Sequence, residues 1–275
     1  MMSGTGIDGY RDFLQRRDGE ADLLNRRLAI REEFFDGLEA DPVRSARRID
    51  REAFLRNLRR RRPEPGLDRE MLFLLATAKL NQAERFGVGL GETYGLNSDA
   101  DVPPERVYVE LEEHYHTRLL AYVLDVFGLT FQVVPPPFVM RQFVKIFVFL
   151  PVRLGFPFVG AAEMAGCVMF DELRRVGVEL FADEPKVAER IESLYSEILT
   201  DEVGHVGYCA AVCTPAERAI MRKLYPVFGR LFARQTAEIN LLISSEKLRA
   251  RLDRPFNVEE LTADLKNETF LAAHP

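Results

Sequence analysis

The sequence predicts an all-α fold. Helical patterns of apolar residues run through nearly all of its 275 residues, and period-two alternation is confined to the short "RVYVELE" (106–112). Proline and glycine fall between the periodic segments, where helices begin and end. A chain of this length can bury one large core, so we expect a single domain.

The N-terminal region, 1–67, is predicted to hold charged helices that pack on the outside of this core. They cover residues 10–40 and 43–61, and the basic cluster "RNLRRRR" (56–62) is interpreted as a solvated helix end. The apolar positions that carry the prediction are Leu14, Leu24, Leu28, Ile30, Phe34 and Phe35.

Four long helices follow in the region 68–252. Asp68 is a suitable N-cap for a helix that runs to about Tyr94, where Gly95 ends it. Pro103 and Pro104 open the next, which ends near residue 127 before a glycine. Two more are expected over 157–181 and 185–213. A helix from residue 215 is expected to continue to 252, and 253–275 forms a C-terminal tail.

The connection between the second and third long helices is the most apolar part of the chain. It contains "PPP" (135–137) and the Phe-rich segment 138–158, in which Arg141, Lys145 and Arg153 interrupt the apolar run. Each uninterrupted piece is shorter than the roughly 20 residues that a membrane span needs. We therefore expect no membrane span, and we leave open whether the segment contacts a membrane surface, a carrier protein or only the core.

Charge and cysteine content narrow the function classes. The net charge of −6 and pI near 5.5 come from interspersed charges, which argues against nucleic acid as a partner. Three cysteines without a CxxC pair do not form a disulfide framework, and the N-terminus lacks a signal peptide pattern. The predicted location is the cytoplasm.

Two of the four histidines follow a glutamate by three residues. These are His116 after Glu113 in "EEHYH" and His205 after Glu202 in "DEVGH". Residues three apart lie on one face of a helix, so each pair can reach the same metal ion. His114 points to another face, and His274 lies in the tail.

Two lone glutamates complete the pattern. Glu84 and Glu163 each stand in a long apolar or small-residue run, where an unpaired charge is costly to bury. Counted from the connecting turns, Glu84 matches Glu113 in height and Glu163 matches Glu202, each to within one helical turn. Bundles that hold two metals use two Glu-x-x-His pairs and two single glutamates in this way.

The predicted ligands are oxygen and nitrogen donors, which suit two iron ions, or manganese, better than structural zinc. Glu113 and Glu202 are expected to bridge the two ions. The acids that precede them, Glu112 and Asp201, are expected to accept the outer imidazole N–H of the histidine on the opposite helix. The complete predicted ligand set is Glu84, Glu113, His116, Glu163, Glu202 and His205.

This ligand order resembles the ferritin-like di-iron carboxylate superfamily over about residues 68–213. "EEHYH" and "DEVGH" look like the E-E-x-x-H and D-E-x-x-H motifs of soluble acyl-carrier-protein desaturases. The resemblance implies a ferritin-like four-helix bundle with one long crossover and extra N- and C-terminal helices. It also implies an O2-dependent oxidoreductase that oxygenates or desaturates an organic substrate and takes electrons from an external donor.

Three alternatives stay open. The chain is also similar to arylamine N-oxygenases, but these carry a seventh ligand, a histidine, where this sequence has Ile198. A ferritin-like protein that oxidises or stores iron, or a di-iron peroxidase, would use the same ligands. A bundle without catalysis, used for interaction, would bind no metal tightly.

A substrate pocket is expected beside the metals, where small and polar residues accompany the glutamates. The expected substrate is a hydrophobic small molecule or a carrier-bound group, and the expected assembly is a homodimer. The residues predicted for the pocket are Gly87, Val88, Gly91, Gly160, Gly166, Cys167, Tyr195, Tyr208 and Cys209.

Overall fold

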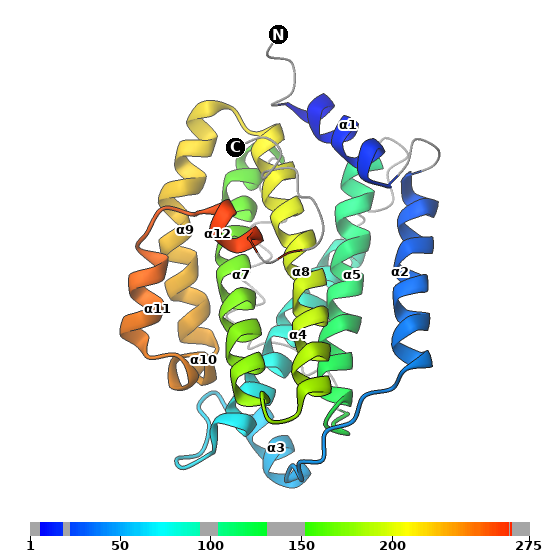
Figure 1. The fold of residues 1–275 in the computed structure, drawn as a ribbon. Coiled ribbons are helices and arrows are strands. Elements are labelled where there is room, and N and C mark those ends of the chain that lie inside the picture. The colour runs from blue at the N-terminus through cyan, green and yellow to red at the C-terminus, as the bar shows by residue number, and fades with distance from the viewer. Residues whose placement is uncertain (1–5, 19–22, 94–103, 131–151, 264, 266–275) are drawn as a thin grey trace.

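The computed structural model describes residues 6–18, 23–93, 104–130, 152–263 and 265, without the side chains of 18, 23, 24, 86–93, 104 and 152–154. Within these ranges the chain forms eleven helices and no strand (Figure 1). The all-α prediction is confirmed. The Phe-rich connection lies largely outside the described residues.

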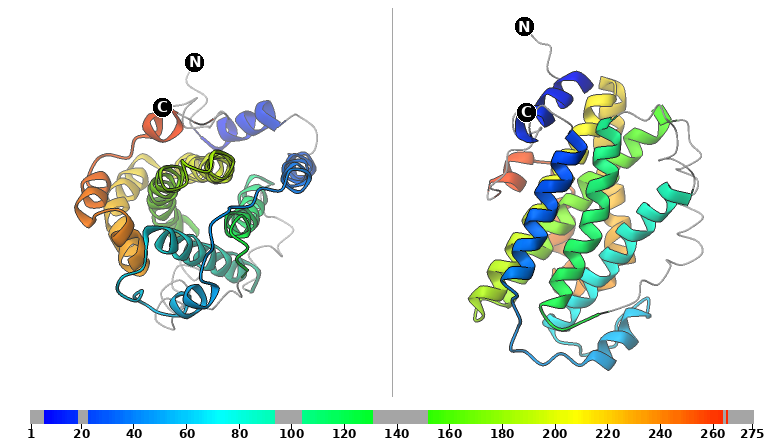
Figure 2. Two further views of the ribbon diagram at one scale, coloured as in Figure 1. Left: turned by 60° about the horizontal axis from the view of Figure 1, so that its bottom comes forward. Right: turned by 90° about the vertical axis from the view of Figure 1, so that its right-hand side faces the viewer.

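Four long helices form the centre of the molecule. They are α4 (Arg69–Thr93), α5 (Pro104–Asp125), α7 (Val152–Leu180) and α8 (Pro185–Val212). α4 packs on α5, α7 packs on α8, and contacts of α5 with α8 and of α4 with α7 close the ring. Figure 2 shows the four helices surrounding a common interior.

The ends of these helices follow local rules that the sequence displays. The Asp68 carboxylate accepts a hydrogen bond from the Met71 N–H at 2.7 Å and caps α4. Gly128, with a φ of +66°, lets the chain turn after α5, so that the Leu129 N–H reaches the Leu124 carbonyl at 3.1 Å. Pro185 occupies the first turn of α8.

The N-terminal region differs from the prediction. Residues 10–40 form two helices, α1 (Ile7–Asp18) and α2 (Leu23–Ala40), and the segment 43–61 is helical only in α3 (Arg51–Leu58). The segment before α3 is bound to the end of the bundle, because the Ser45 N–H donates to the Val126 carbonyl at 2.9 Å and the Ala46 N–H to Glu184 at 2.8 Å. Asp50 then caps α3.

The third long helix begins earlier than predicted. α7 starts at Val152, and Pro157 lies inside it instead of breaking it. A proline in the second turn removes a single hydrogen bond, to the carbonyl four residues before it, near a helix end where several backbone groups lack helical partners anyway.

The predicted C-terminal helix over 215–252 is three helices. α9 (Pro215–Gln235) begins with a capping box between Thr214 and Glu217, and the helical path stops at Thr236. α10 (Ala237–Leu242) then turns onto α4, and Ser244 caps α11 (Ser245–Leu252). A short α12 (Val258–Thr262), capped by Asn257, lies in the predicted tail and packs on α7 and α8.

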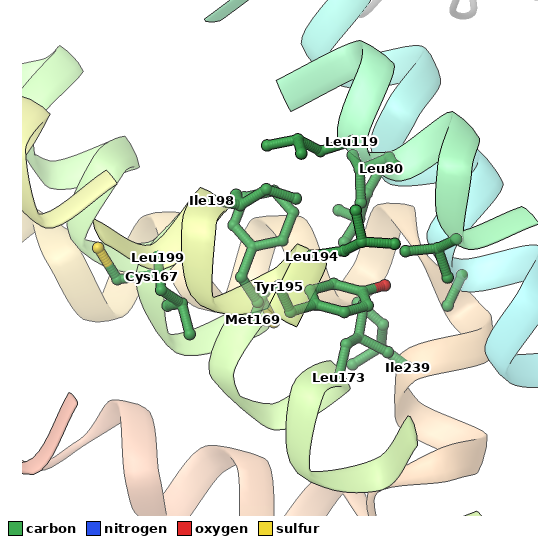
Figure 3. Packing of buried hydrophobic residues seen from close by; sticks show 14 of the residues in the cluster. Leu80, Leu119, Cys167, Met169, Leu173, Leu194, Tyr195, Ile198, Leu199 and Ile239 are labelled. Carbon is green, nitrogen blue, oxygen red and sulfur yellow. The ribbon is translucent and has the colours of Figure 1, made fainter. Parts of the chain in front are cut away.

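Apolar side chains from all four central helices fill the bundle below the predicted site. Leu80, Leu119, Leu194 and Ile198 converge there with residues of α7, all within 9% of complete burial (Figure 3). The Tyr195 hydroxyl in this layer bonds to Thr77 Oγ1 at 2.8 Å. Among the described helices, none has the length and apolar content that a membrane crossing requires.

Candidate metal centre

The four central helices bring together the six residues that the sequence predicts as metal ligands. One group consists of Glu84, Glu113, His116 and Glu202, and a second of Glu113, Glu163, Glu202 and His205. Within each group the potential ligand atoms lie within 4.8 Å of one another. Glu113 and Glu202 belong to both groups, which is the arrangement expected of two adjacent ions that share bridging carboxylates.

Both histidines direct Nδ1 towards the glutamates of the predicted ligand set. Nδ1 of His116 lies 3.2 Å from Glu202 Oε1 and 3.7 Å from Glu113 Oε2, and Nδ1 of His205 lies 3.0 Å from Glu113 Oε1 and 3.9 Å from Glu163 Oε2. Neither Nδ1 atom has a hydrogen-bond partner although both are buried. A buried nitrogen without such a partner is costly, and a metal ion would satisfy both.

The outer ring nitrogens face acids on the opposite helix. His205 Nε2 is hydrogen-bonded to Glu112 Oε2 at 3.1 Å, whereas His116 Nε2 lies 3.3 Å from Asp201 Oδ2, within ion-pair distance but without hydrogen-bond geometry. These are the two cross-helix contacts expected from the acids before the motif glutamates. A carboxylate in this position fixes the proton on Nε2 and leaves the Nδ1 lone pair for a metal.

Among the described residues, the members of the centre differ in their exposure to solvent. The side chains of Glu84, Glu113 and Glu163 are 18%, 23% and 18% exposed, whereas Glu202 is 3% exposed. The histidines and their outer acids are at most 1% exposed. We call the exposed glutamate side the open side, and the side of His116, His205, Glu112 and Asp201 the closed side.

In the metal-free centre, burial and neighbouring carboxylates raise the pKa of two of the glutamates. Burial, followed by the repulsion of Glu113 and Glu202, raises the pKa of Glu84 well above its usual value. Burial and Glu202 do the same for the pKa of Glu163. For Glu113, burial acts in the same direction but is outweighed by contacts with the two histidines, which lower its pKa.

The histidines and Asp201 favour their charged forms. Burial opposes protonation of His116, but contacts with Asp201, Glu113 and Glu202 raise its pKa well above the usual value. His205 behaves alike beside Glu112, Glu113 and Glu163. Burial also opposes the charge on Asp201, yet Arg27, Arg31 and His116 lower its pKa.

Three arginines of the N-terminal helices reach the closed side. None of them is among the site residues predicted from the sequence. Arg27 binds Glu112 and Asp201, Arg31 binds Asp201 and Glu197, and Arg17 lies 3.7 Å from Glu112. A signal existed in α2, because Leu38 and Phe35 are buried and the same stripe continues backwards at spacings of four to Arg31 and Arg27. Leu28, predicted as an apolar contact, is instead 38% exposed.

Two small residues of the predicted pocket have described surroundings: Gly160 lies at a close contact between helices, and Gly166 lies beside the predicted ligand Glu202. A Cβ at Gly160 would lie 2.9 Å from Cys209 Cβ and 2.5 Å from Met221 Sδ, so this glycine allows α8 and α9 to approach α7. A Cβ at Gly166 would lie 3.3 Å from Glu202 Oε2. Cys167 and Cys209 are buried, and burial followed by the charge of nearby glutamates raises the pKa of both thiols.

The other predicted site residues are divided between core and surface. Tyr195 is fully buried in the apolar layer, and Tyr208 packs against Tyr10 in a tilted contact and against Phe156 edge to face, with centroid distances of 5.6 and 5.7 Å. His114 is exposed on α5. Positions that lie outside the described residues or side chains are Gly87, Val88, Gly91, Arg141, Lys145, Arg153 and His274.

Comparison of the chain with known protein families, with curated proteins and with solved structures finds no match in any of the three. The described part of the chain is a helical protein with a buried cluster of glutamates and histidines that could hold two metal ions.

Proposed function

We propose that this protein is a di-iron oxidoreductase that uses O2 to oxygenate or desaturate an apolar organic substrate. In this proposal the central helices form a ferritin-like bundle, and the two ions lie between α4, α5, α7 and α8. Manganese would fit the same donors. Electrons would come from an external donor.

The observation that carries the proposal is the shared pair of carboxylates. Glu113 and Glu202 each belong to both four-residue groups, and each group adds one terminal glutamate and one histidine. Such a set of oxygen and nitrogen donors, without thiolate, suits iron. Two buried Nδ1 atoms without hydrogen-bond partners point into the cluster.

Charge balance supports two divalent ions. The four glutamates of the cluster, together with Glu112 and Asp201, carry six negative charges when all are ionised. The buried guanidinium groups of Arg27 and Arg31 offset two of them. Two divalent cations would offset the remaining four while both imidazoles stay neutral, as ligation requires.

When bound, a pair of iron ions supplies the electrons and open coordination positions that reductive O2 chemistry needs. The chain determines where such chemistry can occur. The closed side keeps water from the histidines, and the partly exposed Glu84, Glu113 and Glu163 leave access from the open side. A substrate would therefore approach over these three glutamates.

The position of Ile198 helps to choose between a desaturase-like reaction and N-oxygenation. Ile198 stands where the N-oxygenases have an additional histidine ligand, and here it is fully buried in the apolar layer (Figure 3). This supports six ligands instead of seven. We therefore propose that the protein oxygenates or desaturates carbon, in preference to oxidising nitrogen.

Metal analysis of the purified protein tests the proposal. After reconstitution under reducing conditions we expect two iron ions per chain, a Mössbauer signal of coupled iron, and O2 uptake when the reduced protein meets air. Fewer than one iron or manganese ion per chain would overturn the proposal and favour an interaction bundle. Shell-sized particles in light scattering would favour iron storage instead.

A further inference from the structure

Arg27 joins the two halves of the closed side. Its Nη2 atom lies 2.5 Å from Glu112 Oε1 and also donates to Asp201 Oδ1. Glu112 belongs to α5 and contacts His205, while Asp201 belongs to α8 and contacts His116. One guanidinium group from α2 therefore connects both outer carboxylates, and through them both histidines.

The Arg27 side chain is held in this place from outside. Its guanidinium lies over the Tyr108 ring at 5.5 Å, and the Tyr108 hydroxyl accepts a hydrogen bond from Arg17 of α1. Arg27 is 5% exposed and Tyr108 is fully buried. The ring and the two carboxylates leave the guanidinium little freedom to move.

Arg31, one turn further along α2, contacts only one of the two halves. It binds Asp201 and, through Nη1, Glu197 Oε2 at 2.6 Å, and it lies over the Tyr115 ring at 5.9 Å. No contact between Arg31 and Glu112 is found among the described residues. The two arginines thus form a natural pair for comparison, since one serves both histidines and the other serves His116 alone.

Covering the bundle would not by itself require these arginines. Buried ion pairs lose much solvation energy, and apolar residues of similar volume commonly stabilise a fold as well or better. Phe35 and Leu38 fill the next buried positions of the same helix face with apolar side chains. The two charges sit where α2 passes the histidine-carboxylate pairs, which indicates a role in the centre.

We propose that Arg27 is a positioning residue for both metal positions, so that α2 is a working part of the centre. Arg27 holds Glu112 and Asp201 in place, and these acids hold the rings of His205 and His116 with Nδ1 directed at the ions. The inference rests on the proposed function in one respect, since it requires that the protein binds two metal ions.

Zinc loading combined with histidine NMR tests this inference without any enzyme assay. Zn²⁺ is diamagnetic and accepts imidazole and carboxylate ligands. In full-length protein labelled with ¹⁵N-histidine, only four rings give signals, and the Nε2–H protons of His116 and His205 report their contacts with Asp201 and Glu112. Calorimetry with Zn²⁺ measures affinity on the same samples.

In Arg27→Gln we expect both ring N–H signals to shift or broaden and the Zn²⁺ affinity to fall about 10-fold or more, as for other outer partners of metal ligands. In Arg31→Gln only the His116 signal should change. Arg174→Gln is the matched control, because Arg174 is 4% exposed and paired with Asp171 and Glu192 away from the centre. Both signals and the affinity should stay at wild-type values in this control.

If Arg27→Gln does not fold, Arg27→Lys keeps the buried charge and serves as the second variant. A lysine ammonium lacks the guanidinium plane that stacks on Tyr108, so both signals should still broaden, with a smaller loss of affinity. Unchanged signals and an affinity within twofold of wild type in either folded variant would overturn the inference. Wild-type protein that takes up no Zn²⁺, iron or manganese would instead overturn the proposed function.

Discussion

The two sides of the candidate centre are built differently. On the closed side, both histidines and both outer acids are at most 1% exposed, and each acid is bound to arginine as well as to a ring nitrogen. On the open side, Glu84, Glu113 and Glu163 are about one fifth exposed. No arginine or lysine is found paired with these three among the described residues.

This difference in burial and ion pairing would suit the two sides to two different roles. A ligand held by a buried network keeps one orientation, whereas a partly exposed carboxylate can change its binding mode as other ligands come and go. Under the proposed function, the closed side would hold the ions and the open side would admit reactants. The following experiments change residues of either side or of the apolar layer below the centre, or compare the metal-free with the metal-loaded protein.

The largest effect should follow the loss of a shared ligand. Glu113→Ala removes a carboxylate from both four-residue groups, so we expect metal content to fall from two ions to fewer than one per chain, measured by elemental analysis. His205→Ala should also abolish binding, although His205 belongs to one group only, because it is the single nitrogen donor of that group. His114→Ala is the control, because this neighbour is exposed and should retain both ions. Full occupancy in Glu113→Ala would contradict a bridging role.

The second largest effect is expected in the free energy of unfolding of the metal-free protein, which should depend more on the closed side than on the open side. Asp201→Ala leaves Arg27 and Arg31 without a shared buried partner, and breaking such a pair costs about 3–5 kcal/mol. Glu84→Gln replaces a carboxyl whose raised pKa already favours the neutral form, so its cost should stay below about 1 kcal/mol. Urea unfolding measures both. Equal losses would show that the sides do not differ.

The pH dependence of stability should reverse when metal binds. His116 and His205 have pKa values raised above the usual value of about 6.5, so their stabilising contribution is complete below that pH and is lost as pH rises through the raised values. Glu84 and Glu163 act in the same direction, and their contribution begins to decline already above the usual glutamate pKa of about 4.3. The melting temperature of metal-free protein should therefore fall above about pH 6.5.

Metal-loaded protein should show the opposite trend, because ions replace these protons and bind more tightly as pH rises. Differential scanning calorimetry of both forms between about pH 6 and 9 measures the gap between the two melting temperatures, which we expect to widen. Asp201 and Glu113, whose pKa values are lowered, stay ionised across this window and do not affect the trend. Parallel curves would refute the exchange of protons for metal.

The smallest effect is expected in the apolar layer below the centre. Tyr195→Phe removes the hydrogen bond to Thr77 Oγ1, while Thr77 keeps its bond to the Phe73 carbonyl at 3.0 Å. The free energy of unfolding should fall by about 1 kcal/mol, with metal content unchanged. Loss of metal in this variant would give Tyr195 the role near the site that its sequence position suggested.

The sequence predicts the inner residues of the centre because helix geometry alone relates them. Spacing of three places Glu113 with His116 and Glu202 with His205, and equal distances from the turns align the single glutamates. Glu112 and Asp201 come one residue before the motif glutamates, and the prediction that each reaches the histidine of the opposite helix also uses the packing of a two-metal bundle.

The arginines are different, since their role depends on which helix α2 contacts. From the sequence, Leu28 looks like a core residue and Arg27 like a solvated one, but the structure exposes the first and buries the second. The charges of Glu112 and Asp201 decide this orientation, and they lie on other helices. A local sequence pattern does not show which charged residues of distant helices form ion pairs.

Helix limits show the same division. Asp68 and Gly128 mark helix ends through local hydrogen bonds, and the structure follows both. Pro157 and Thr236 do not follow the local expectation, because α7 accommodates its proline and α10 is drawn onto α4. There the Lys79 Nζ atom lies 2.5 Å from the fully buried Glu238.

The pairing of Arg27 with Asp201 also has a consequence for the folding of the chain during its synthesis. The two residues are 174 positions apart, so α2 leaves the ribosome long before α8 exists. Contacts between such distant segments are slow to form, because the chain entropy of closing the long loop must be overcome first. The buried arginines of α2 therefore gain their partners only after α8 has been made, and only then can the network around the six predicted ligands be completed.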